Sequence, residues 1–82
     1  MKNIDIYTMD NCTYCTRAKL LLEEKKLEFN DYNIMHNPEL MIEMVSRTNK
    51  RTVPQIFING DSIGGYDELE YLNNCGKLER YL

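Results

Sequence analysis

The spacing of apolar residues in the first 34 positions switches between strand-like and helix-like, and this switch most constrains the fold. Residues 2–8 (KNIDIYT) alternate, which places Ile4 and Ile6 on one side of a short strand. From position 14 the spacing becomes helical, and residues 27–34 (LEFNDYNI) favour a second strand. A strand, a helix and a strand in this order predict parallel pairing with the helix packed on the sheet. The apolar face of that helix comprises Cys15, Ala18 and Leu22, with Leu21 alongside.

The second half of the chain adds a helix, a hairpin and a last helix. Residues 36–48 (HNPELMIEMVSRT) place Asn37 at an N-cap and Pro38 at the first helical position. Within residues 53–65 the dipeptide Asn-Gly at 59–60 is the one that tight hairpin turns favour, so antiparallel pairing is expected there. Asp67 can open the last helix. The order β-α-β-α-β-β-α therefore predicts an α/β fold with a mixed sheet flanked by helices.

Composition limits the classes of protein that this chain can belong to. Eighty-two residues predict one domain, residues 1–82, and the 43% hydrophobic content suffices for one core. No apolar run exceeds three residues, which excludes a membrane-spanning helix of roughly 20. A net charge of −3 argues against general nucleic-acid binding. The early acidic residues do not fit a signal peptide and the cysteine count of three does not fit a secreted framework, so a cytoplasmic protein is expected.

Cys12 and Cys15 lie at the start of the first predicted helix. The N-terminus of a helix carries unpaired N–H groups and a partial charge of roughly +0.5, which stabilise a thiolate. Cysteines in such positions have pKa values of about 3.5–7.5, against roughly 8.5 for a free thiol. We therefore interpret Cys12, at the exposed tip, as a nucleophile, and Cys15, on the apolar face, as the thiol that resolves a mixed disulfide.

Other interpretations of the cysteine pair explain less. A structural zinc ion is bound by four ligands. Besides this pair, only His36 and Cys75 could serve as further His or Cys ligands, and they are unpaired and distant in sequence. A purely structural disulfide across so small a loop removes little chain entropy. Two inert core thiols would account for Cys15 but not for Cys12, which follows polar and turn-forming residues. His36 is expected in a loop, and Cys75 is expected to be a buried or half-exposed free thiol.

Pro54 precedes a strand-like run, where proline cannot donate to a sheet ladder. One interpretation is an ordinary trans proline that begins the strand, because only about 5–6% of X–Pro bonds are cis. The other is a cis Val53–Pro54 bond, which leaves the backbone N–H and C=O of Val53 free to pair with an extended peptide. Periodicity alone does not choose between them.

Three stretches resemble the glutaredoxins, small members of the thioredoxin superfamily. They are IYTMDNCTYCTRAKLLL (6–22), RTVPQIFI (51–58) and IGGYDEL (63–69), in that family's order and spacing. The resemblance implies a thioredoxin-like fold with a four-stranded mixed sheet, a cis Pro54, and a glutathione-dependent thiol–disulfide oxidoreductase. Glutathione would be the reductant, protein disulfides and glutathionylated proteins the substrates, and a monomer the expected state.

The resemblance also assigns roles to single residues. Cys12 would form the mixed disulfide with glutathione and Cys15 would resolve it. Val53 would pair with the cysteinyl unit through its backbone, and Arg51 would pair with the glycyl carboxylate unless it is an ordinary surface arginine. Asp67 would face the ammonium of the γ-glutamyl end. The glutathione site as a whole would comprise Tyr14, Arg51, Thr52, Val53, Pro54, Gly65, Tyr66 and Asp67.

Two departures from the family pattern matter. Thr13 replaces the proline of the common C-P-Y-C motif, so a backbone N–H returns next to Cys12. Because some relatives without this proline hold a [2Fe–2S] cluster between two subunits, a cluster-binding dimer is the alternative function. Met9 stands where many relatives carry lysine, so weaker glutathione binding is expected. A thioredoxin-like reductant fed by a flavoprotein is disfavoured, because the chain lacks tryptophan and the W-C-G-P-C pattern.

Overall fold

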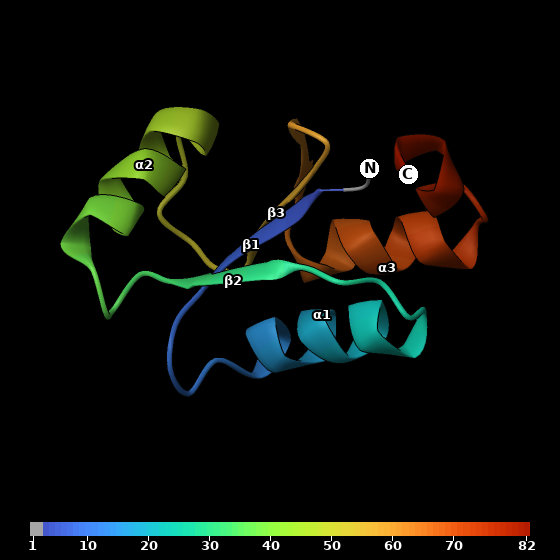
Figure 1. Cartoon of the computed structure of the whole chain (residues 1–82), viewed down its shortest axis with the longest axis horizontal. Coiled ribbons are helices and arrows are strands. Elements are labelled where there is room, and N and C mark those ends of the chain that lie inside the picture. The colour runs from blue at the N-terminus through green and yellow to red at the C-terminus, as the bar shows by residue number, and fades with distance from the viewer. Residues whose placement is uncertain (1–2) are drawn as a thin grey trace.

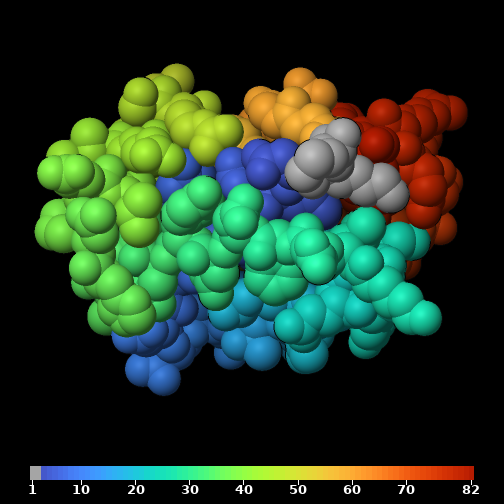
Figure 2. Space-filling model, viewed as in Figure 1, coloured from blue at the N-terminus to red at the C-terminus, as the bar shows by residue number. Residues whose placement is uncertain are grey.

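The computed structural model describes residues 3–82, which form one four-stranded sheet with helices on both faces. The strands lie in the order β2-β1-β3-β4. The space-filling view shows the blue strand β1 as a strip between the green segment around β2 and the orange β3–β4 hairpin (Figure 2). The elements are β1 (Ile4–Thr8), α1 (Thr13–Glu24), β2 (Asn30–Asn33), α2 (Pro38–Thr48), β3 (Gln55–Ile58), β4 (Asp61–Gly64), α3 (Tyr66–Asn74) and the 3₁₀ helix η1 (Leu78–Tyr81).

The sheet is mixed, as predicted, but its second strand–helix–strand unit is not parallel. Strands β1 and β2 pair in parallel, whereas β3 runs antiparallel to both β1 and β4. The direction of β3 follows from the end of β1 at which the chain re-enters the sheet. Strand β2 ends with Asn33 opposite Thr8, and β3 begins with Gln55 opposite Tyr7, so α2 leaves and returns at the same end of β1. A strand that starts at this end must run the other way.

The second strand is shorter than the sequence pattern predicts. It covers Asn30–Asn33 rather than residues 27–34, because its one neighbour is β1 and the register ends at Asp5. Leu27 and Phe29, expected in this strand, instead pack from the preceding loop against the core. In the first strand the predicted residue Lys2 lies outside the described residues.

Each face of the sheet has its own apolar core. Ile4, Ile6, Ile56 and Ile58 project to the face covered by α1, α3 and η1, whereas Tyr7 and Phe57 project to the face covered by α2. Figure 1 shows α1 and α3 side by side on one side of the sheet and α2 on the other. The helices contribute Ala18, Leu22, Leu69 and Leu78 to the first core and Met44 to the second.

Local sequence signals set several element boundaries. Asn37 caps α2 by accepting a hydrogen bond from the backbone N–H of Glu39 at 3.0 Å, and Pro38 is the first helical residue. Asn59 and Gly60 adopt positive φ values of 51° and 88° at the hairpin turn, where Asn-Gly is favoured. These boundaries confirm the predictions, whereas α3 begins at Tyr66, one residue earlier than predicted.

Candidate functional site

Cys12 caps the first helix with its own sulfur. Its backbone is extended, and its Sγ accepts a hydrogen bond from the backbone N–H of Cys15 at 3.1 Å. Its carbonyl accepts from the backbone N–H of Thr16 at 3.1 Å. Because an N-cap side chain satisfies N–H groups that the helix leaves unpaired, this sulfur lies where a negative charge is stabilised. The geometry confirms the predicted placement of Cys12 at the helix tip.

The two cysteines form a disulfide and differ in exposure. Their Cα atoms are 5.2 Å apart. Cys15 is 2% exposed and lies on the same helix face as Ala18 and Leu22, whereas Cys12 is half-buried. Cys75, the remaining cysteine, is an exposed free thiol at the C-cap of α3, so the expectation that it is at least partly buried was wrong. It follows the last residue of that helix, beyond the turns that pack against the core.

The loop that leads from β1 to Cys12 is held by polar contacts. The side-chain amide of Asn33 donates to Asp10 at 2.8 Å, and His36 lies 3.8 Å from the same carboxylate. Asn11 takes a left-handed conformation with φ 56°, which asparagine tolerates better than most residues. His36 is an exposed loop residue, as predicted, and its side chain contacts Asp10 of this loop.

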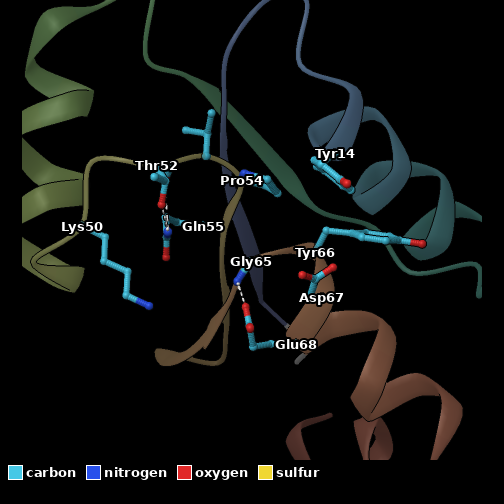
Figure 3. Close-up of a pocket in the computed structure, with 10 residues that line it drawn as sticks. Tyr14, Lys50, Thr52, Pro54, Gln55, Gly65, Tyr66, Asp67 and Glu68 are labelled. Atoms are coloured by element: carbon cyan, nitrogen blue, oxygen red, sulfur yellow. Dashed lines mark hydrogen bonds between the residues drawn. The ribbon is translucent and has the colours of Figure 1, made fainter.

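A groove of about 180 Å³ lies beside the start of α1. Three segments line it, namely the first turn of α1, the loop before β3, and the start of α3. Figure 3 shows Lys50 on one side of the groove and the two tyrosines on the other. The lining residues are Tyr14, Lys50, Thr52, Val53, Pro54, Gln55, Gly65, Tyr66, Asp67 and Glu68.

The loop before β3 contributes the floor of this groove. The Val53–Pro54 peptide bond is cis, which is the conformation that the family resemblance implies. Gln55 is 3% exposed, and its side-chain amide donates to the carbonyl of Thr52 at 3.0 Å and to its Oγ1 at 3.3 Å. This buried amide ties the loop back on itself and fixes Thr52 next to the cis bond.

The start of α3 carries two carboxylates with different surroundings. Oε1 of Glu68 accepts a hydrogen bond from the backbone N–H of Gly65 at 2.6 Å. Asp67 is exposed, and its carboxylate lies beside Tyr66 in the groove (Figure 3). The N-cap Gly65 has no side chain to accept from the first turn of the helix. This helix end therefore offers N–H donors and partial positive charge, which suit a carboxylate.

Two tyrosines form one wall of the groove. The ring centroids of Tyr14 and Tyr66 are 5.9 Å apart, and the Arg17 guanidinium lies 5.4 Å from the Tyr14 ring centroid. The Tyr66 hydroxyl donates to Glu70 at 2.8 Å, and this bond raises the pKa of Tyr66 above its ordinary value. Tyr66 therefore remains a neutral phenol near pH 7, while Tyr14, 53% exposed, borders both the groove and the surface around Cys12.

The groove brings together seven of the eight residues predicted for a glutathione site. Arg51 is the exception: it is exposed and is not among the lining residues, whereas its neighbour Lys50 is. Sequence reasoning also missed Gln55 and Glu68. The signal for Glu68 was present, because a Glu three residues after an N-cap is typical of a reciprocal helix cap. Nothing in the sequence indicated which of two adjacent cations faces the groove.

Residues 3–82 bring together no group of three or more His, Cys, Asp or Glu side chains that could hold a metal ion. In the same part of the chain, no helix combines the length and the apolar character needed to cross a bilayer.

Comparison with known proteins gives one consistent result. A family model for glutaredoxin matches residues 4–63. Glutaredoxin 3 of Escherichia coli K12 is 44% identical over 82 residues, which cover 100% of this chain and 99% of that protein. The solution structure of glutaredoxin from Brucella melitensis is 45% identical with a TM-score of 0.84, over 98% of this chain and 87% of that one. A crystal structure of a buckwheat glutaredoxin–glutathione complex has a TM-score of 0.89 at 26% identity, over 99% and 76% of the two chains.

Proposed function

The chain belongs to the glutaredoxin family and is a thiol–disulfide oxidoreductase, and we propose that glutathione is its reductant. The proposed substrates are protein disulfides and glutathionylated protein thiols. Support for glutathione comes from the groove beside α1, whose lining has a cation on one side and a helix N-terminus on the other. A tripeptide with a carboxylate near each end and an ammonium beside one of them complements such a lining.

The observation that carries this proposal is the difference in exposure between the two cysteines. Cys12 is half-buried at the helix tip, whereas Cys15 is 2% exposed behind it. A bulky disulfide substrate can therefore meet Cys12 first. Because the N–H of Cys15 already points at Cys12 Sγ, the same donor is in place to stabilise the Cys12 thiolate after reduction.

The proposed reaction on a glutathionylated protein has two exchange steps. The Cys12 thiolate attacks the glutathione sulfur of the mixed disulfide, a Cys12–glutathione disulfide forms, and the substrate leaves as a thiolate. A second glutathione thiolate then attacks the bound glutathione sulfur, which releases glutathione disulfide and restores the Cys12 thiolate. Each step exchanges one S–S bond for another, and the incoming glutathione thiolate is the reductant, because the glutathione unit of the substrate is already at the disulfide oxidation level.

A protein disulfide takes a second route. Cys12 attacks one of its sulfurs, and Cys15 then attacks Cys12, which releases the reduced protein and forms the Cys12–Cys15 disulfide seen in the structure. Two glutathione molecules reduce that disulfide. This route needs both cysteines, whereas the first needs Cys12 alone.

We place glutathione along the groove as the family resemblance implies, with one change. The backbone of Val53 pairs with the cysteinyl unit, and the start of α3 at Gly65 and Tyr66 takes the γ-glutamyl carboxylate. Asp67 faces the ammonium. We propose Lys50 as a partner for the glycyl carboxylate because it lines the groove, while the same role for Arg51 stays a prediction.

The decisive experiment is a coupled assay with glutathione, glutathione reductase and NADPH, on wild type, Cys12→Ser and Cys15→Ser. Cys12→Ser should lose turnover on every substrate, and Cys15→Ser should keep deglutathionylation but lose reduction of protein disulfides. Serine is a favoured N-cap, so Cys12→Ser should unfold in urea close to reduced wild type, which serves as the control. Full activity of Cys12→Ser would overturn the mechanism.

The alternative function, a dimer that carries a [2Fe–2S] cluster, stays a prediction based on Thr13. A visible absorption spectrum of protein purified without oxygen separates the two. Charge-transfer bands that disappear in Cys12→Ser would support the cluster, and a spectrum without such bands would support the oxidoreductase alone.

A further inference from the structure

The two carboxylates at the start of α3 are next to each other in sequence and line the same groove, yet they face different partners. The Glu68 side chain folds back so that its Oε1 accepts from the Gly65 N–H at 2.6 Å. Asp67 lies beside Tyr66 instead (Figure 3). The carboxylate of Glu68 is therefore already engaged by the backbone, whereas Asp67 is free to meet a ligand.

The backbone before α3 is shaped around the Glu68 side chain. A Cβ placed on Gly64 would lie 2.7 Å from Oε1 and 2.9 Å from Cγ of Glu68, both closer than real side chains approach. On Gly65 a Cβ would lie 3.4 Å from the same Oε1 and 3.4 Å from the carbonyl oxygen of Pro54. Gly64 therefore leaves open the space that Glu68 occupies, and Gly65 lies between Glu68 and the loop of Pro54.

The start of α3 also differs from the starts of α1 and α2. Cys12 and Asn37 cap α1 and α2 with their own side chains, but Gly65 offers none. At α3 the capping bond runs the other way. The cap residue Gly65 donates its own N–H, and the side chain of Glu68 in the first helical turn accepts it. The N–H groups of Tyr66 and Asp67, which precede the first intrahelical bond, are left for an outside acceptor.

We propose that Glu68 is a positioning residue for the γ-glutamyl end of glutathione, an inference that rests on the proposed function. Its bond to Gly65 holds the first turn of α3 against Pro54, and so fixes where the N–H groups of Tyr66 and Asp67 meet the ligand carboxylate. On this account Gly64 leaves the space that the Glu68 side chain occupies, and Glu68 in turn positions the residues that bind the ligand.

The test compares two probes on Cys12 in a Cys15→Ser background, where the internal disulfide cannot form. The Cys12 thiolate exchanges with glutathione disulfide or with hydroxyethyl disulfide, and mass spectrometry gives the equilibrium fraction of each mixed disulfide. Hydroxyethyl disulfide has no γ-glutamyl end, so it reports on Cys12 alone. Glu68→Ala should lower the glutathione equilibrium constant about fivefold, the scale of a lost helix cap, and leave the hydroxyethyl constant unchanged.

Glu68→Gln is the matched rescue. Its amide oxygen can accept the same bond from Gly65, so the glutathione constant should return to within about twofold of the parent protein. Glu28→Gln, on an exposed loop residue outside the groove lining, controls for the change of net charge. The amide proton of Gly65 should exchange faster with solvent in Glu68→Ala and at the parent rate in Glu68→Gln.

The outcomes distinguish this inference from the proposed function. If the parent protein shows no preference for glutathione over hydroxyethyl disulfide, the proposed function fails first. If the parent shows the preference and Glu68→Ala keeps it, or loses both probes equally, Glu68 has no positioning role. Failure of Glu68→Gln to rescue would also overturn the inference.

Discussion

The starts of α1 and α3 present the same backbone chemistry to two different groups. At α1 the cap residue Cys12 supplies a sulfur that accepts from the first turn. At α3 the cap residue is Gly65, and a glutamate from the first turn reaches back to it. Both ends carry unpaired N–H groups and partial positive charge. In the proposed function, the same electrostatic device holds the reacting sulfur at one helix start and receives the ligand carboxylate at the other, and the cap residue makes the difference.

The largest predicted effect tests whether both helix ends depend on the same core. Leu22 of α1 and Leu69 of α3 are each 0% exposed in one apolar cluster. Leu22→Ala and Leu69→Ala should each lower the free energy of unfolding by about 2–5 kcal/mol, measured by urea titration of the reduced protein. Leu20→Ala, at a side chain that is 51% exposed, is the control and should change it by less than about 0.5 kcal/mol. A small loss for either buried leucine would mean that its helix is held by other contacts.

The next effect separates the two helix ends by function. Asp67→Asn removes the charge proposed to face the ligand ammonium, while Cys12 and its cap remain. We expect the KM for a glutathionylated substrate to rise about fivefold, as for a lost exposed charge pair, with an unchanged Cys12 pKa. Asp61→Asn on the hairpin is the charge-matched control. A change in the Cys12 pKa with no change in KM would show that the two ends are not independent.

The smallest effect concerns the first N–H of α1. Thr13 is the first helical residue, where proline is well tolerated, so Thr13→Pro should keep the helix while removing one donor beside Cys12. Because the hydrogen bond to Cys12 Sγ comes from the Cys15 N–H and not from Thr13, the loss should be modest. We expect the Cys12 pKa to rise by about half a unit, as measured from the rate of iodoacetamide alkylation as a function of pH. An unchanged alkylation profile would show that the Thr13 N–H does not stabilise the Cys12 thiolate.

Short-range patterns allowed most of the fold to be predicted. The cap at Asn37, the turn at 59–60 and the apolar face of the first helix each depend on a few neighbouring residues, and all are confirmed. The direction of β3 was not predictable in this way. It depends on which end of β1 the chain reaches after α2, and this is set by tertiary packing.

The candidate site follows the same division. The cysteine motif and the Thr-Val-Pro and Gly-Gly segments indicated where the groove would form, because each belongs to a local turn or helix start. The sequence could not predict whether Lys50 or Arg51 lines the groove, since adjacent side chains in an irregular loop have no fixed period. The spacing of Glu68 from Gly65 allowed the hydrogen bond between them to be predicted. The space that Gly64 leaves for the Glu68 side chain is visible only in the structure.

The burial of Cys15 fixes the regiochemistry of every exchange at this disulfide. An incoming thiolate must approach along the S–S axis, and the far side of the bond, at Cys15, is closed by the core. In the proposed reaction, attack therefore falls on Cys12, and Cys15 is the sulfur that departs. The enzyme cannot be trapped as an adduct on its inner thiol, so each oxidised molecule has a single way back to the reduced form.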